Sequence, residues 1–150
     1  MLQYYFTMKR LLPLLLLTLF VGSSLAFSSP QEEKTYRLIL EVDGMTETKG
    51  DLLIAIYNKE ESYPKQAFKY ETAPVDSLIK HVTLILPEGQ YVISLFHDTN
   101  GNKKLDQGEY GIPLEKYGFS NNARGQMGLP AFKDAAFLLK SDSKQYITVH

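Results

Sequence analysis

The sequence predicts an all-β protein built as a two-sheet antiparallel β-sandwich, immunoglobulin-like or transthyretin-like, with about seven strands. Short runs rich in β-branched and aromatic residues alternate with Gly, Pro, Asp and Asn along most of the chain. No stretch keeps a helical apolar period over several turns, which argues against long helices. Residues 82–86 and 91–96 each have one apolar face and one mixed face, which is typical of strands that pack on a second sheet.

The expected strands cover residues 36–42, 52–57, 81–86, 90–97 and 145–149. Residues 135–139 form either a further strand or a helical turn. Between residues 60 and 78, Pro64 and Pro74 interrupt any regular pattern, so at most a short, marginal helix over 65–68 fits there.

The connection at residues 86–91 carries a turn signal, with Pro87 early and Gly89 late. Proline fixes the backbone at the start of such a turn, and glycine accepts the unusual conformation near its end. We therefore predict a β-hairpin in which strands 81–86 and 90–97 pair with each other.

The N-terminus has the three parts of a secretory signal peptide. Lys9 and Arg10 precede an apolar run at 11–21, and small residues ending at Ala26 follow it. At about 1.5 Å per residue, that run spans only about half of a ~30 Å hydrocarbon core, which favours a cleaved signal over a membrane anchor. The sequence thus predicts a signal peptide at 1–26 and a single domain at 27–150.

The predicted signal implies a protein exported to the periplasm or the extracellular space, without stable membrane insertion after cleavage. The start residue stays open, because Met8 begins a more typical signal than Met1 does. No cysteine is present, which excludes disulfides, thiolate metal sites, thiol catalysis and a cysteine-linked lipid anchor. The formal charge of -1 makes nucleic acid an unsuitable partner.

Residues 98–109 match the spacing of a twelve-residue calcium loop of the EF-hand type. Calcium takes six to eight oxygen ligands, and a coiled loop supplies them by turning alternate side chains inward. Calcium is therefore the expected cofactor. The candidate ligands are Asp98, Asn100, Asn102, the backbone carbonyl of Lys104, Asp106 and Glu109.

Two departures predict weak binding at this loop. A strand leads into it and Pro113 follows it, so no exit helix is expected. Lys103 occupies the position that normally needs a glycine with positive φ, and this conformation costs lysine about 1–2 kcal/mol, or about five- to thirty-fold in affinity. The expected dissociation constant is about 10⁻⁴ to 10⁻³ M. The alternative is a metal-free loop that satisfies its own backbone.

The segment 111–130 has little strand character and contains aromatic side chains, which is typical of a functional loop. The candidate ligand-binding residues are Tyr117, Asn121, Asn122 and Arg124, and the partner would be a protein or a glycan of the cell envelope. In the alternative interpretation, Tyr117 and Phe119 pack the loop onto the sandwich and the two amides cap its turns.

No nucleophile motif is recognisable, and no catalytic residue is predicted. His97 beside Asp98 is a lone histidine at a strand end, for which a structural role is the more common one. The leading hypothesis is a non-enzymatic, calcium-binding recognition module. The alternatives are an envelope enzyme with a polar site near residues 117–126 and a purely structural protein with a metal-free loop. The oligomeric state stays open.

Three stretches carry a resemblance to a known family. They are Phe96-His97-Asp98-x-Asn100-Gly101-Asn102, then Gly111-Ile112-Pro113 followed by Tyr117-Gly118-Phe119-Ser120-Asn121-Asn122, and finally Gly128-x-Pro130-x-Phe132. Together they resemble a bacterial family of small exported proteins catalogued as a domain of unknown function. That family usually has Gly at the position of Lys103.

Two further resemblances concern parts of the chain. The Asp/Asn loop is similar to calcium loops in β-sandwich repeats of bacterial adhesins. The turn at Pro87 and Gly89 is similar to one in transthyretin-like sandwiches. Both resemblances support the predicted fold and imply nothing specific about activity.

Overall fold

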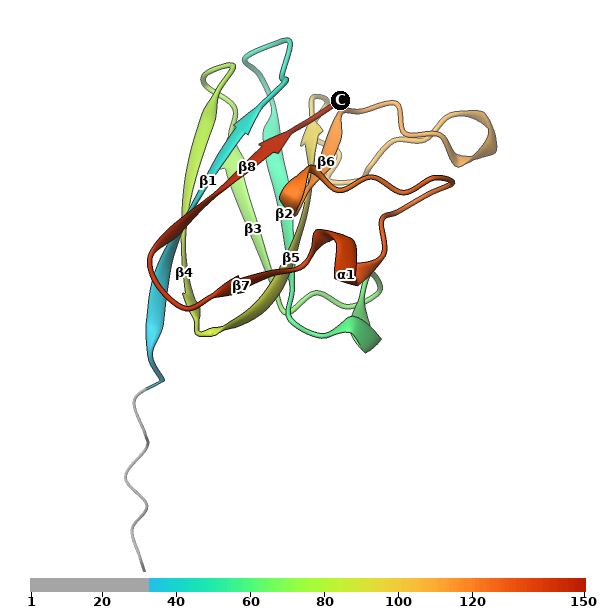
Figure 1. The fold of residues 1–150 in the computed structure, drawn as a ribbon. Coiled ribbons are helices and arrows are strands. Elements are labelled where there is room, and N and C mark those ends of the chain that lie inside the picture. The colour runs from blue at the N-terminus through green and yellow to red at the C-terminus, as the bar shows by residue number, and fades with distance from the viewer. Residues whose placement is uncertain (1–32) are drawn as a thin grey trace, which may run out of the picture. The chain divides into compact units, whose positions relative to one another are not determined.

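The computed structural model describes residues 33–150 as two β-sheets that pack face to face (Figure 1). The predicted signal peptide, 1–26, and both candidate start residues lie outside the described residues. Within 33–150, no helix has the length and apolar character needed to cross a membrane. The all-β sandwich prediction is confirmed.

The first sheet has the strand order β4-β1-β8. Its strands are β1 (Thr35–Asp43), β4 (Lys80–Pro87) and β8 (Ser143–Thr148). β1 pairs antiparallel with β4 but parallel with β8, so the prediction of a purely antiparallel sandwich is wrong for this pair. The chain reaches β8 from the other sheet, at the end where β1 also begins, and the two strands therefore run in the same direction.

The second sheet has the order β3-β2-β5-β6. Its strands are β2 (Asp51–Tyr57), β3 (Lys69–Pro74), β5 (Gly89–Asp98) and β6 (Tyr117–Phe119). A short strand, β7 (Phe137–Leu139), pairs with the beginning of β5.

The predicted hairpin between the third and fourth expected strands is wrong. β4 and β5 lie in different sheets, and the chain crosses between them at Glu88, whose N–H donates to the Lys34 carbonyl. Leu86 of β4 and Ile93 of β5 both point into the space between the sheets. A Pro-x-Gly turn can reverse the chain within one sheet or between two sheets. Which of these occurs depends on the strands that each flanking strand pairs with, and these are distant in the sequence.

The sequence missed β3 and β6, and the helix predicted at 65–68 is absent. A 3₁₀ turn at Glu60–Ser62 precedes that position instead. Segment 135–139, expected to be either a strand or a helical turn, contains both. Helix α1 (Phe132–Ala135) ends at its first residue, and β7 covers its last three. Two further 3₁₀ turns lie at Glu109–Gly111 and Ser120–Asn122.

Apolar side chains lie on both faces of the second sheet. The larger cluster fills the space between the sheets and includes Leu38, Leu40, Ile54 and Ile93, all at most 1% exposed. Alternation along β5 turns Val92 to the opposite face, where it packs in a second cluster with Phe132 of α1. Burying such side chains contributes about 1.5–3 kcal/mol each.

Tyrosines extend the second cluster. The ring of Tyr63 lies edge-on to Tyr57 at 5.1 Å and to Phe132 at 5.9 Å between ring centroids. Its hydroxyl donates to the Pro130 carbonyl at 3.0 Å, which fastens the 124–130 loop to this face. Burial, with a smaller contribution from Tyr57, raises the pKa of Tyr63 to about 12.

Ser120 completes the hydrogen bonding along the edge of β5 that faces away from β2. β6 pairs with residues 94–96 of that edge and β7 with residues 89–91. The fully buried Ser120 Oγ lies between them, accepting from Ile93 N at 2.9 Å and donating to the Ala135 carbonyl at 2.6 Å. One hydroxyl thus connects the edge of the sheet to α1.

The two sheets are also joined at the β6 and β8 edges. Tyr117 N donates to the His150 carbonyl at 3.4 Å, and His150 N donates to the Tyr117 carbonyl at 3.2 Å. Gly118 permits this approach, because a Cβ there would lie 2.7 Å from Cγ2 of the buried Ile147. β6 is therefore bonded on both edges.

Replacing Ser120 with Ala should lower the free energy of unfolding by about 1–3 kcal/mol, because the buried Ile93 N–H loses its acceptor. Urea denaturation followed by circular dichroism measures the loss. Ser141→Ala, at an exposed turn, is the matched control and should change it by less than about 0.5 kcal/mol. Equal stability of both variants would contradict this role for Ser120.

Stability should also fall as the pH rises from about 10 to about 12. The folded protein keeps the Tyr63 proton up to a pKa of about 12, whereas the unfolded chain releases it near 10. The stabilisation is therefore complete below pH 10 and is lost as the pH rises through 12. Chemical denaturation across this range should show a shallower decline for Tyr63→Phe than for a control, Tyr110→Phe, at an exposed ring. An equal decline of stability with pH in both variants would contradict the raised pKa of Tyr63.

Candidate functional site

Asp98 organises the loop predicted to bind calcium. It is the last residue of β5 and is fully buried. Its Oδ1 accepts from Gly101 N at 2.7 Å and its Oδ2 from Lys103 N at 2.8 Å. Both carboxylate oxygens therefore turn the backbone around a single side chain, as position 1 of the predicted loop requires.

Asn100, Asn102 and Asp106 are brought into direct contact. The amide nitrogen of Asn100 donates to Asp106 Oδ2 at 2.6 Å, and that of Asn102 donates to Oδ1 at 2.9 Å. The amide oxygens face the backbone instead, where Asn100 Oδ1 accepts from Asn102 N and Asn102 Oδ1 from Lys104 N. A cation at Asp106 would require these amides to rotate, because calcium binds oxygen and not amide nitrogen.

Lys103 has a φ of 60°, which is the left-handed conformation expected at its position. In this conformation Lys103 N donates to the buried Asp98, and Lys104 N donates to Asn102. These bonds need no cation, so we expect the conformational cost of about 1–2 kcal/mol to fall mainly on folding and not on ion binding. The calcium affinity itself stays a prediction.

Glu115, which the sequence analysis missed, closes the loop. The residue is 9% exposed, and its carboxylate accepts from Thr99 N through Oε1 and from Asp106 N through Oε2, both at 3.1 Å. The predicted ligand Glu109 instead lies exposed in a 3₁₀ turn whose next residue, Tyr110, has a φ of 61°. Glu115 lies beyond the twelve-residue pattern, so the loop motif gave no signal for it.

The donors near this loop are hard oxygen ligands. Within residues 33–150, no group of three or more His, Cys, Asp or Glu side chains is placed to hold a metal ion. A cation here would depend on the carboxylates of Asp98 and Asp106, the two amides and backbone carbonyls. That donor set suits calcium better than a transition metal, but it carries few charges.

His97 and Gly50 support the base of the loop. The buried His97 ring donates through Nε2 to the Lys49 carbonyl at 2.7 Å, consistent with the structural role expected for it. Gly50 has a φ of 71°, and a Cβ there would lie 2.0 Å from the Asp98 carbonyl oxygen. The β1–β2 connection therefore packs closely behind Asp98.

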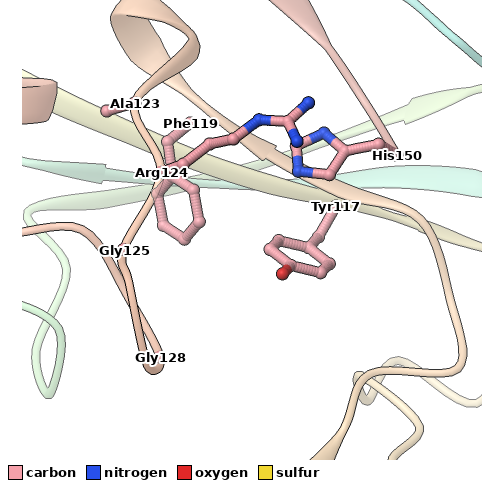
Figure 2. Close-up of a pocket in the computed structure, with 7 residues that line it drawn as sticks. All are labelled: Tyr117, Phe119, Ala123, Arg124, Gly125, Gly128 and His150. Atoms are coloured by element: carbon pink, nitrogen blue, oxygen red, sulfur yellow. The ribbon is translucent and has the colours of Figure 1, made fainter.

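A pocket of about 180 Å³ opens beside β6. Its lining consists of Tyr117, Phe119, Ala123, Arg124, Gly125, Gly128 and His150 (Figure 2). The Tyr117 ring lies 5.4 Å from the His150 imidazole, at an angle of 44°. Figure 2 shows the Arg124 side chain extending toward the His150 ring. Two of the predicted ligand-binding residues, Tyr117 and Arg124, thus meet in one pocket.

Asn121 and Asn122 bond to the backbone outside the pocket lining. The Asn121 side-chain nitrogen donates to the Ala136 carbonyl at 2.9 Å, and Asn122 Oδ1 accepts from Thr148 N at 2.8 Å. Both residues have positive φ. These bonds favour the interpretation in which the amides cap turns. His150 was missed as a pocket residue because only its pairing with β6 brings it beside Tyr117.

Comparison with known proteins found one family. No curated protein and no solved structure is similar to the chain. A family model described as an uncharacterized protein conserved in bacteria, DUF2141, matches residues 40–147. This range includes nearly all of both sheets, the loop and the pocket lining except His150. This match confirms the resemblance to a bacterial family of unknown function, while the likeness to adhesin calcium loops stays a prediction. The chain belongs to the DUF2141 family of uncharacterized bacterial proteins.

Proposed function

We propose that this chain is a non-enzymatic, exported β-sandwich module of the cell envelope. In this proposal the 98–109 loop binds calcium, and the segment 111–130 recognises a protein or a glycan. The observation that carries the proposal is the Glu115 carboxylate, which bonds to backbone N–H groups at both Thr99 and Asp106. It links the proposed ion site to the segment that contains the pocket.

The loop chemistry supports weak calcium binding. Each oxygen of Asp98 uses one lone pair on a backbone N–H and keeps a second for a cation. Asp106 becomes available once the Asn100 and Asn102 amides rotate, which also turns their oxygens toward the ion. Losing those hydrogen bonds offsets part of the binding energy, so the dissociation constant falls at about 10⁻⁴ to 10⁻³ M, as in extracellular calcium modules.

Calcium would affect the pocket through Glu115. An ion held by Asp106 restrains the residue whose N–H donates to Glu115 Oε2. Glu115 is two residues from Tyr117, the first residue of β6. Ion binding would therefore reduce motion in the chain entering the pocket, and binding to the folded state alone stabilises the domain by mass action.

A purely structural protein is the second candidate function. The observation that favours it is the hydrogen bonding within the loop, in which two side-chain amides already donate to the Asp106 carboxylate. Such a loop keeps its shape without an ion. Calcium titration separates the two candidates.

Calcium at about ten times its dissociation constant should raise the free energy of unfolding by about 1.4 kcal/mol, or several degrees in Tm. Differential scanning calorimetry of the exported protein at 0 and 10 mM calcium measures the shift. Asp98→Asn should abolish most of it, whereas Glu60→Gln, an exposed acid outside the loop, should leave it unchanged. The absence of any shift in the unmodified protein would eliminate the calcium proposal.

Lys103→Gly should stabilise the domain with little effect on calcium. Glycine removes the left-handed strain but adds unfolded-state entropy, which leaves a gain of about 0.5–1 kcal/mol. The calcium dissociation constant from isothermal calorimetry should change by no more than about threefold, through loss of one exposed ammonium. A tenfold or larger gain in affinity would mean that the strain arises on ion binding.

A further inference from the structure

We infer that the pocket formed by Tyr117, Phe119, Arg124 and His150 binds the carboxylate-bearing sugar residue of an acidic glycan. This inference rests on the proposed recognition role of segment 111–130 and narrows its ligand class. It does not depend on calcium. Four features of the pocket support it: an unpaired cation, an aromatic floor, an open side and a blocked strand edge.

Arg124 is free to bind an anion. The ion pairs within residues 33–150 join Lys49 to Glu47, Lys69 to Glu71, Lys80 to Asp76, and His81 to Glu41. None involves Arg124, and no acidic side chain lines the pocket. A guanidinium presents donors in a planar fork that matches the two oxygens of a carboxylate. An anion in the pocket would therefore supply the partner that the described residues lack.

The pocket floor is aromatic and its volume is small. Tyr117 and the buried Phe119 lie edge-to-face, with ring centroids 6.0 Å apart, and the His150 ring forms a side wall. A volume of about 180 Å³ is below the 300–1,000 Å³ of most small-molecule sites. It suits one sugar ring, whose apolar C–H face packs on an aromatic ring while its carboxylate reaches Arg124.

One side of the pocket lacks side chains, which lets a longer molecule continue outward. Gly128 lies on this side, whereas Gly125 packs closely against the backbone of Gly128 and Leu129. A Cβ built on Gly128 would meet nothing within 4 Å, so solvent lies directly beyond it. A sugar unit attached to a chain can enter here without burying the rest of the chain.

The strand beside the pocket cannot accept a peptide strand. β6 pairs with β5 along one edge, and on its other edge Tyr117 exchanges two hydrogen bonds with His150. Peptides that bind by strand addition need an exposed sheet edge. This argues for a ligand recognised through a ring and a charge, and thus for a glycan over a peptide.

The test uses the exported protein and follows amide signals by NMR during titration with sodium D-glucuronate. Shifts should gather at Tyr117, Gly125 and His150, with a dissociation constant of about 1–10 mM. D-glucose should bind at least about tenfold more weakly, because it lacks the carboxylate. Acetate binding as tight as glucuronate would show a simple anion site only, and tighter binding of an acidic tripeptide would show a peptide site. Either result would overturn the inference.

Arg124→Gln should weaken glucuronate binding at least about tenfold, since it removes the charged donors. Arg37→Gln, an equal loss of charge at an exposed position of β1, is the matched control and should bind like the unmodified protein. Thermal unfolding of both variants checks that the fold is retained, because Arg124 is an exposed loop residue. Unchanged binding by Arg124→Gln would also overturn the inference.

Calcium and glucuronate are measured on separate signals. Calcium is followed at Gly101 and Asn102, and glucuronate at Gly125 and His150, because Tyr117 lies close to the Glu115 link and would respond to both. Calcium is removed with a chelating resin, because a soluble polycarboxylate chelator would compete for Arg124. Glucuronate shifts without calcium shifts would refute the calcium proposal alone, and the converse would refute this inference alone.

Discussion

The backbone of β5 must be hydrogen-bonded along both edges, and this constraint positions both the loop at Asp98 and the pocket beside β6. The strand lies in the interior of its sheet, with apolar side chains on both faces, so most of its N–H and C=O groups are shielded from water. β2 pairs with residues 92–98 along one edge. The other edge is satisfied in pieces by β6, Ser120 and β7, which fixes three separate parts of segment 117–139 against the sheet. The pocket and the loop at Asp98 are held in position by the same strand.

The loop after β5 illustrates how one set of polar groups serves two purposes. Carboxylates and amides that suit calcium are the same groups that satisfy the N–H groups of a tight turn. In the described conformation they satisfy the turn, and Asp98 supports two N–H groups by itself. The hydrogen bonds of the loop itself thus account for its shape, and under the proposed calcium binding only the Asn100 and Asn102 amides would need to reorient. Such a loop, with few charges, would combine rapid exchange with low affinity.

The sequence predicted those features that depend on interactions between residues close together in the chain. Strands β1, β2, β4, β5 and β8 follow from β-branched alternation, and the conformation of Lys103 follows from its place in the loop. Long-range features were not predictable in this way. The Pro87–Gly89 turn joins two sheets because β5 pairs with β2, a strand more than thirty residues away in the sequence. β6 is a three-residue strand with no pattern of its own. Glu115 and His150 join their sites only after the chain has folded back.

The parallel pairing of β1 with β8 determines how the domain carries mechanical load. Residues 38–43 lie in register with 143–148, so the start of β1 and the end of β8 are at opposite ends of the pair. Tension applied between them acts along the strands and strains their hydrogen bonds together, not one after another. Antiparallel neighbours pulled from adjacent ends separate bond by bond at much lower force. The parallel pairing therefore favours resistance to shear between the first and last strands of the domain.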